Sequence, residues 1–213
     1  MGYYPLFLEM KGRPCLVIGG GQVAQRKVEG LLAAGASVTV VSPDLTGELD
    51  VLKSKRRIDH RQRDYQSNDL KGFDIVVAAT DDKATNARVD TDARANRVLV
   101  NAVDDPDSCD FILPSVVRRG EVVLAISTGG LSPALARRLR EELEAYLSED
   151  FAPLVELLAE VRGDLRTRGV SVEAAVWQRA IDGRLRELLS AGRRAEARSR
   201  LLTALGVDKH LPT

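Results

Sequence analysis

The sequence has few of the residues that cross-link a chain or ligate a metal. Only two cysteines, Cys15 and Cys109, and two histidines, His60 and His210, occur among its 213 residues. This scarcity argues against a disulfide framework, and we expect no resident metal site. It also favours a reducing, cytoplasmic location.

The sequence also lacks an excess of positive or negative residues, and it lacks a long apolar run. The 31 basic and 31 acidic residues cancel, so no overall field attracts the chain to nucleic acid or to an anionic membrane, and any anion must be recognised locally. No apolar segment reaches the about 18 residues that span a bilayer, and no leader pattern opens the sequence. We expect a soluble, unprocessed chain with no nucleic-acid or membrane partner.

The sequence does contain an alternation of short apolar runs with helical patterns over its first hundred residues. PCLVI, SVTVV and FDIVVAAT are typical of buried strands, and VLVNA follows as another. Strands that alternate with helices predict a parallel sheet with right-handed crossovers, here a Rossmann-like α/β domain. The expected strands cover 14–18, 37–41, 58–62, 73–80 and 98–102, and the expected helices cover 22–34, 45–53 and 83–96.

A different pattern follows residue 110. FILPSVVRR and EVVLAIS flank Gly120 and predict a β-hairpin. Ser132-Pro133 is a capping residue followed by proline, which predicts a helix start, and Leu135, Leu139, Leu143 and Leu147 predict a core-facing stripe on that helix. The helical pattern continues to residue 206 with breaks at 148–150, 169–171 and 192, and the predicted domains are 1–113 (Rossmann), 114–147 (central segment) and 148–213 (helical).

The first chemical motif is Gly19-Gly20-Gly21-Gln22-Val23-Ala24, a G-x-G-x-x-A variant of the dinucleotide fingerprint. In that motif Gly19 permits the tight turn, Gly21 lets a pyrophosphate approach the backbone, and Ala24 lets the helix pack close to the sheet. The helix N-terminus then favours the anion. A glycine-rich turn alone is a weak signal, but its place between a predicted strand and a predicted helix favours cofactor binding over a structural turn.

The residues after the second strand leave the cofactor's identity open. Dinucleotide folds that prefer NAD carry an acid there for the ribose, but this chain has Ser42, and Asp44 lies two positions on. Asp44 is as plausible a loop cap as a ribose ligand. Arg26 and Lys27 could meet a 2′-phosphate, yet they lie inside the predicted helix, so NAD is favoured over NADP without being fixed.

Polar residues also follow the fourth and fifth predicted strands. Thr80 begins one such segment, and Asn101 begins another that contains Asp104 and Asp105. Because the carboxyl ends of parallel strands share one edge, we predict that Thr80 and Asn101 contact the cofactor and that a carboxylate there handles the proton that accompanies hydride transfer. Helix caps or turns explain such acidic pairs equally well.

Four motifs, GGGQVAQRK, AATDD, NAVDDPDSCDFILPS and STGGLSPALARRLREELE, occur in an order and spacing that resemble the precorrin-2 dehydrogenase/sirohydrochlorin ferrochelatase family of siroheme biosynthesis. The family includes the N-terminal module of siroheme synthases, and the resemblance covers about residues 3–148. It implies a homodimer in which the central segment mediates dimerisation and a helical domain follows. The implied reaction is oxidation of precorrin-2 to sirohydrochlorin with NAD.

The resemblance also implies roles for individual residues. Asp104 matches the family's essential aspartate, and a carboxylate beside the cofactor can take the proton that the substrate loses. The family binds NAD through the positions of Gln22, Val23, Pro43 and Asp44. It also brings a loop, here with Thr128 and Gly129, near the substrate, although a plain Gly-Gly turn needs no function.

A tetrapyrrole carries many carboxylates, so a neutral chain must supply local cations. We predict that Arg137 and Arg138 bind them through guanidinium forks, although a solvated helix face explains the cluster equally well. Some family members also insert Fe²⁺ into sirohydrochlorin. The sequence offers no clear His or Cys near the motifs to hold the metal, which favours dehydrogenation alone, and Fe²⁺ insertion stays open.

Two other functions fit parts of the sequence. An NAD-sensing Rossmann regulatory module without catalysis would share the glycine loop but would not need the NAVDD segment. A short-chain dehydrogenase would need Tyr-x-x-x-Lys, and none of the four tyrosines has a lysine four residues later. We assign no role to His60 or His210.

Overall fold

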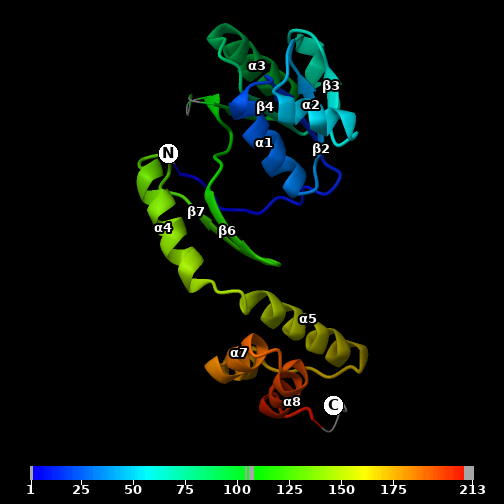
Figure 1. Ribbon diagram of the computed structural model, residues 1–213, viewed down its shortest axis with the longest axis vertical. Coiled ribbons are helices and arrows are strands. Elements are labelled where there is room, and N and C mark those ends of the chain that lie inside the picture. Colours follow the sequence, from blue (N-terminus) through cyan, green and yellow to red (C-terminus); the bar gives the residue numbers. More distant parts are fainter. Residues whose placement is uncertain (1, 104, 106–107, 209–213) are drawn as a thin grey trace. The chain divides into compact units, whose positions relative to one another are not determined.

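The computed structural model describes residues 2–103, 105 and 108–208. The chain forms two compact units, Met1–Leu113 and Pro114–Thr213, which are drawn in blue to green and in green to red in Figure 1. The predicted Rossmann-like sheet, the hairpin and the helical C-terminal part are all confirmed. None of the described helices is both long enough and apolar enough to cross a membrane.

The first unit is built on a five-stranded parallel sheet with the order β3-β2-β1-β4-β5. Ile18 lies beside Val41 on one side and Ala78 on the other, and Ala78 lies beside Ala102. The carboxyl ends of four strands therefore meet at one edge, and the strand order reverses between β1 and β4, which is where such sheets bind ligands. The strands are β1 (Pro14–Ile18), β2 (Ser37–Val41), β3 (Asp59–Arg61), β4 (Ile75–Ala78) and β5 (Leu99–Ala102).

Two hydrophobic cores cover the two faces of this sheet. Cys15 and Val17 of β1 join one core, and Leu16 and Ile18 join the other, because side chains alternate between the faces of a strand. Helices close both faces, which explains why the strands read as unbroken apolar runs. These helices are α1 (Gln22–Ala33), α2 (Gly47–Ser54) and α3 (Lys83–Asn96), with a short 3₁₀ helix at Ser67–Leu70.

The 3₁₀ helix was not predicted, because it is held by a buried acid rather than by apolar periodicity. Asp69, only 3% exposed, accepts hydrogen bonds from Arg61 Nη1 (2.8 Å), from Arg63 Nη1 (2.7 Å) and from the Gln66 backbone N–H (2.9 Å). Burial alone would raise the pKa of Asp69, but these hydrogen bonds outweigh burial and lower it from 3.8 to about 2. Asp69 therefore holds the segment that follows β3 in place by binding Arg61, Arg63 and the Gln66 backbone.

We expect the Asp69 carboxylate to make the free energy of unfolding depend on pH in the acidic range. Because the folded pKa lies below the unfolded one, the stabilisation is fully present above about pH 4 and is lost as the pH falls towards 2. The partners are partly exposed, so the effect should be about 1–2 kcal/mol. Asp69→Asn should flatten the fall in unfolding free energy over this range in urea titrations. Exposed Asp59→Asn is the control, and equal slopes for wild type and Asp69→Asn would contradict the assignment.

The second unit begins with an antiparallel hairpin of β6 (Ser115–Arg119) and β7 (Val122–Ile126). Helix α4 (Pro133–Tyr146) packs against it and starts as predicted, with Ser132 Oγ accepting from Leu135 N–H at 3.2 Å. The predicted core-facing stripe is only partly correct. Leu147 is buried, but Leu135 is 49% exposed, because only part of that face meets the hairpin.

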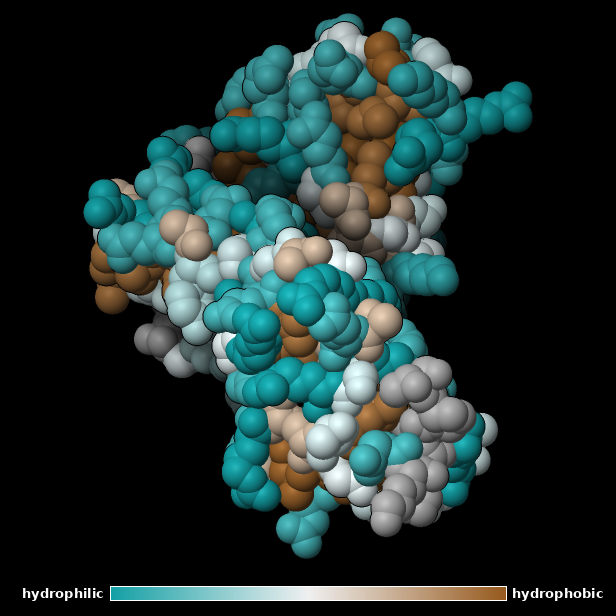
Figure 2. Space-filling model, turned by 60° about the horizontal axis from the view of Figure 1, so that its bottom comes forward, coloured by the Kyte–Doolittle hydropathy of each residue, from teal (hydrophilic) through white to brown (hydrophobic). Residues whose placement is uncertain are grey.

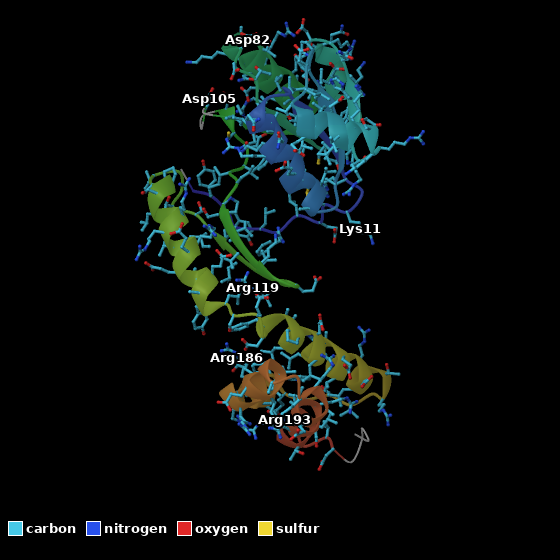
Figure 3. The ribbon with its side chains drawn as sticks, viewed as in Figure 1. Lys11, Asp82, Asp105, Arg119, Arg186 and Arg193 are labelled. Carbon is cyan, nitrogen blue, oxygen red and sulfur yellow. The ribbon has the colours of Figure 1, made fainter. Side chains whose placement is uncertain are left out.

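The four C-terminal helices bury a core of their own, which includes Leu157, Leu185 and Leu201. One break was not predicted: α6 ends at Ala180, and Asp182 caps α7 by accepting from Leu185 N–H at 2.8 Å. On the face shown in Figure 2, hydrophilic and hydrophobic side chains are interspersed, and the hydrophilic ones predominate. Arg186, labelled in Figure 3, joins α7 to the start of α5 through Asp150 at 2.6 Å. The helices are α5 (Phe151–Thr167), α6 (Ala174–Ala180), α7 (Gly183–Ser190) and α8 (Arg194–Ala204).

Candidate dinucleotide site

The carboxyl edge of the sheet brings together loops that are far apart in the sequence. Gly19 N–H donates to Val41 O at 2.9 Å, which joins the ends of β1 and β2. Ala79 N–H donates to Ile18 O at 2.8 Å, which joins β4 to β1. The segments that carry the predicted residues Gly19, Asp44, Thr80 and Asn101 thus line one edge, at the switch point between β1 and β4.

The three consecutive glycines meet different surroundings. Gly19 has φ +116°, and a Cβ there would lie 2.3 Å from Ala79 O. A Cβ on Gly20 would lie 1.9 Å from Asp44 O. A Cβ on Gly21 would meet nothing within 4 Å. The fold therefore requires Gly19 and Gly20, whereas Gly21 leaves open backbone at which a ligand can approach.

Helix α1 presents its N-terminus at this open backbone. Gly21 is the N-cap, no side chain caps the helix, and its first turn holds no acid. The first backbone N–H groups of a helix have no partner within it, and its dipole favours an anion at this end. Gln22 is exposed, and Ala24 is fully buried against the sheet core. The geometry fits a pyrophosphate at the predicted positions Gln22 and Val23.

The loop after β2 lies directly against the glycine loop. Thr46 N–H donates to Gly20 O at 2.9 Å. Ser42 is 4% exposed, and its Oγ donates to Asp44 O at 2.5 Å, so the serine hydroxyl is not available to a ribose. Pro43 and Asp44 are exposed, and the Asp44 carbonyl lies against Gly20, so this loop offers Asp44 as an accessible acid.

The residues after β4 are held mainly by one another. Thr80 Oγ1 donates to Asn86 Oδ1 at 2.9 Å, and Asn86 Nδ2 donates to Thr80 O at 2.9 Å. Asp82, labelled in Figure 3, caps α3 by accepting from Ala84 N–H and Thr85 N–H. The Thr85 hydroxyl bond is the main cause that lowers the Asp82 pKa. Asp82 therefore has the structural role of a cap, and the cofactor contact of Thr80 stays a prediction.

The segment after β5 is fastened back onto that strand. Asn101 is 7% exposed, and its Nδ2 donates to Phe111 O at 2.9 Å. Cys109 Sγ donates towards Ala102 O at 3.2 Å and Asp105 O at 3.3 Å, and burial raises the pKa of this thiol. The amide nitrogen of Asn101 is thus committed to the protein. Asp104 lies outside the described residues.

In the second unit, the predicted substrate residues make local contacts. Thr128 Oγ1 accepts from Ser132 N–H and donates to Ser132 O, both at 3.1 Å, and Gly129 is exposed. Arg138 pairs with Glu142 at 2.7 Å. The Arg137 guanidinium is exposed and has no ion pair within the described residues. An exposed ion pair contributes little stability, so the pair with Glu142 does not prevent Arg138 from binding a substrate carboxylate. Carboxylate binding by Arg137 and Arg138 remains a proposal.

Within residues 2–103, 105 and 108–208, no three or more His, Cys, Asp or Glu side chains form a group that could hold a metal ion. The residues that sequence reasoning missed are Gly20 and Ser42. The run of three glycines was the available signal for Gly20. Ser42 left no signal beyond the missing acid, because its bond to Asp44 depends on the shape of the loop.

Comparison with known proteins matches both units of the chain to described families. A family model described as putative NAD(P)-binding matches residues 6–115, and one described as sirohaem biosynthesis protein central matches residues 119–146. The siroheme synthase of Methylococcus capsulatus is 41% identical over 96% of the length of this chain. The siroheme synthase of Photobacterium profundum is 38% identical over 95% of the length of this chain. The chain spans 44% of each of them. A solved structure of SirC, precorrin-2 dehydrogenase, superposes with a TM-score of 0.76 at 29% identity, covering 94% of this chain and 100% of that one.

Proposed function

Because the chain belongs to the precorrin-2 dehydrogenase and siroheme synthase family, whose NAD(P)-binding model spans residues 6–115, we propose that it oxidises precorrin-2 to sirohydrochlorin with NAD⁺. The observation that carries the proposal is the uncapped α1 N-terminus, open at Gly21 and set at the switch point of the sheet. This is the geometry that a dinucleotide pyrophosphate requires.

The chain's own groups divide the work. The N–H groups of Gln22 and Val23 bind the pyrophosphate, and the Asp44 carboxylate accepts from the ribose hydroxyls. NAD⁺ supplies the hydride acceptor. The substrate loses a hydride and a proton, and Asp104, two residues after the last residue of β5 in the sequence, takes that proton. Thr128, Gly129, Arg137 and Arg138 are proposed to contact the substrate and its carboxylates.

The direct test mixes the purified protein with precorrin-2 and NAD⁺ and follows NADH by absorbance. One NADH should form for each precorrin-2 consumed, because the oxidation removes two electrons. A parallel reaction with NADP⁺ measures cofactor preference. Failure of the wild-type protein to form reduced cofactor in either reaction would overturn the proposed activity.

Asp44 should set the preference for NAD⁺ over NADP⁺. A carboxylate that binds the ribose 2′-hydroxyl repels a 2′-phosphate, so Asp44→Ala should lower kcat/KM for NAD⁺ by about tenfold or more, the effect of one charged hydrogen bond. The substitution should also reduce the ratio of kcat/KM for NAD⁺ to kcat/KM for NADP⁺. Asp50→Ala, an exposed acid on neighbouring α2, is the control. An unchanged ratio of the two cofactors would place the discrimination elsewhere.

The second unit offers a surface for the homodimer that the family resemblance implies. Leu131 is 92% exposed, and Leu135 and Tyr146 of α4 are 49% and 68% exposed. We propose that these side chains lie in the dimer interface, because large exposed apolar patches mark such interfaces. Sedimentation should give a dimer, and a monomer at assay concentration would count against it. A cytoplasmic location accords with the two free cysteines, and Fe²⁺ insertion stays an open alternative.

A further inference from the structure

Ser42 takes a position that dinucleotide-binding folds usually give to a ribose-binding acid, yet it is almost fully buried. Its Oγ donates to Asp44 O at 2.5 Å. Its own carbonyl accepts from His60 Nε2 at 2.9 Å. Its backbone N–H donates to Arg61 O at 3.3 Å. The serine is therefore held at three points, and its hydroxyl is committed to the turn that carries Asp44.

That turn is also the wall against which the glycine loop packs. A Cβ on Gly20 would stand 1.9 Å from Asp44 O and 2.5 Å from Ser42 Oγ. Gly20 O in turn accepts from Thr46 N–H at 2.9 Å. The Ser42 hydroxyl, the Asp44 carbonyl and the Gly20 backbone thus form one contact, so the hydroxyl fixes the distance between the turn after β2 and the glycine loop.

We propose that Ser42 is a positioning residue for the dinucleotide: its hydroxyl holds the Pro43–Asp44 turn so that the Asp44 carboxylate, rather than residue 42, receives the adenosine ribose. This inference rests on the proposed function and names how the site binds its cofactor. Hydride transfer occurs at the nicotinamide end of the cofactor. The Ser42 bond therefore acts on cofactor affinity and leaves the chemical step alone.

The variant Ser42→Asp distinguishes this arrangement from the usual one, in which an acid at this position binds the ribose. In the usual arrangement Ser42→Asp restores the ribose ligand and tightens NAD⁺ binding. In this chain the new carboxylate would face Asp44 O, where a hydroxyl now donates, and two acceptors would oppose each other. Ser42→Asp should therefore weaken NAD⁺ binding by about tenfold or more, and Ser42→Ala, which loses one hydrogen bond, by about 5–10-fold.

The experiment titrates wild type, Ser42→Ala and Ser42→Asp with NAD⁺ and with ADP by calorimetry. It also measures kcat with precorrin-2 at saturating NAD⁺ and Tm for each protein. Ser54→Ala is the matched control, because Ser54 Oγ donates to Asp50 O at 2.8 Å in the same kind of side chain-to-carbonyl bond, on the exposed end of α2. The inference expects weaker binding of both NAD⁺ and ADP by the Ser42 variants, with kcat near that of wild type.

The outcomes are distinct. Wild type that does not bind NAD⁺ overturns the proposed function and this inference with it. Wild type that binds, with Ser42→Ala equally tight, overturns the inference alone. Tighter binding by Ser42→Asp does the same, because residue 42 would then be the ribose ligand. A parallel fall in Tm, kcat and affinity in Ser42→Ala would show a structural role and would also overturn it.

Discussion

Asp104→Asn protein is expected to form NADH from precorrin-2 about 10²–10⁴-fold more slowly than wild type, the usual contribution of one positioned acid or base. The oxidation must release a proton as well as a hydride, and the chain offers Asp104 in the segment that follows β5 at the carboxyl edge. The substitution replaces an acceptor of protons with an amide of the same size. Binding of NAD⁺, measured by titration, should stay within about twofold of wild type, because the Asp104 side chain is assigned to the substrate's proton.

Asp105→Asn is the matched control for this prediction. Asp105 is adjacent and exposed, and its carboxylate accepts from Ser108 Oγ at 2.8 Å, a bond that an amide oxygen can also accept. The Asp105→Asn protein should oxidise precorrin-2 at a rate near that of wild type. If both variants oxidise precorrin-2 at the wild-type rate, Asp104 is not the proton acceptor. If wild type binds NAD⁺ yet does not oxidise precorrin-2, an NAD-sensing module becomes the better description.

Gly19→Ala should strongly destabilise the first unit. An alanine would have to adopt φ +116° and would place its Cβ 2.3 Å from the Ala79 carbonyl oxygen. The strained backbone and the overpacking each cost about 1–3 kcal/mol, so the free energy of unfolding should fall by about 2–6 kcal/mol. Urea denaturation would measure this loss.

Gly21→Ala provides the contrast two residues away. Gly21 has φ −81° and open space at its Cβ position, so the free energy of unfolding should change by less than about 0.5 kcal/mol. The added methyl group would instead stand where a pyrophosphate approaches, and NAD⁺ affinity should fall by about tenfold or more. A Gly21→Ala protein that binds NAD⁺ as tightly as wild type would contradict the placement of the pyrophosphate. A Gly19→Ala protein of wild-type stability would contradict the loop geometry.

The sheet of the first unit was predictable because its signals are local. Each buried strand is a continuous apolar run, and glycine or polar residues bound it, so β1, β2 and α3 were located to the residue. The 3₁₀ helix at Ser67–Leu70 was missed, because Asp69 is stabilised by Arg61 and Arg63, and no periodic pattern records such a pair.

The candidate site was predicted in outline and missed in detail for a related reason. The motif identified the glycine loop, but the separate requirements at Gly19, Gly20 and Gly21 depend on which atoms lie opposite each Cα. Exposure of Leu135 was missed likewise, since a stripe of leucines does not say how much of it another element covers. Residue type and spacing predict the chemistry, whereas the neighbour across the fold decides what each position tolerates.

Strand β1 contributes residues to both cores of the first unit, and it leads directly into the glycine loop. The loop is tied at Gly19 to β2 and at Gly20 to Thr46 by backbone hydrogen bonds. The backbone that would meet a cofactor is thus already ordered before a ligand arrives. Little conformational entropy remains to be lost on association, and more of the intrinsic contact energy should appear as measured affinity.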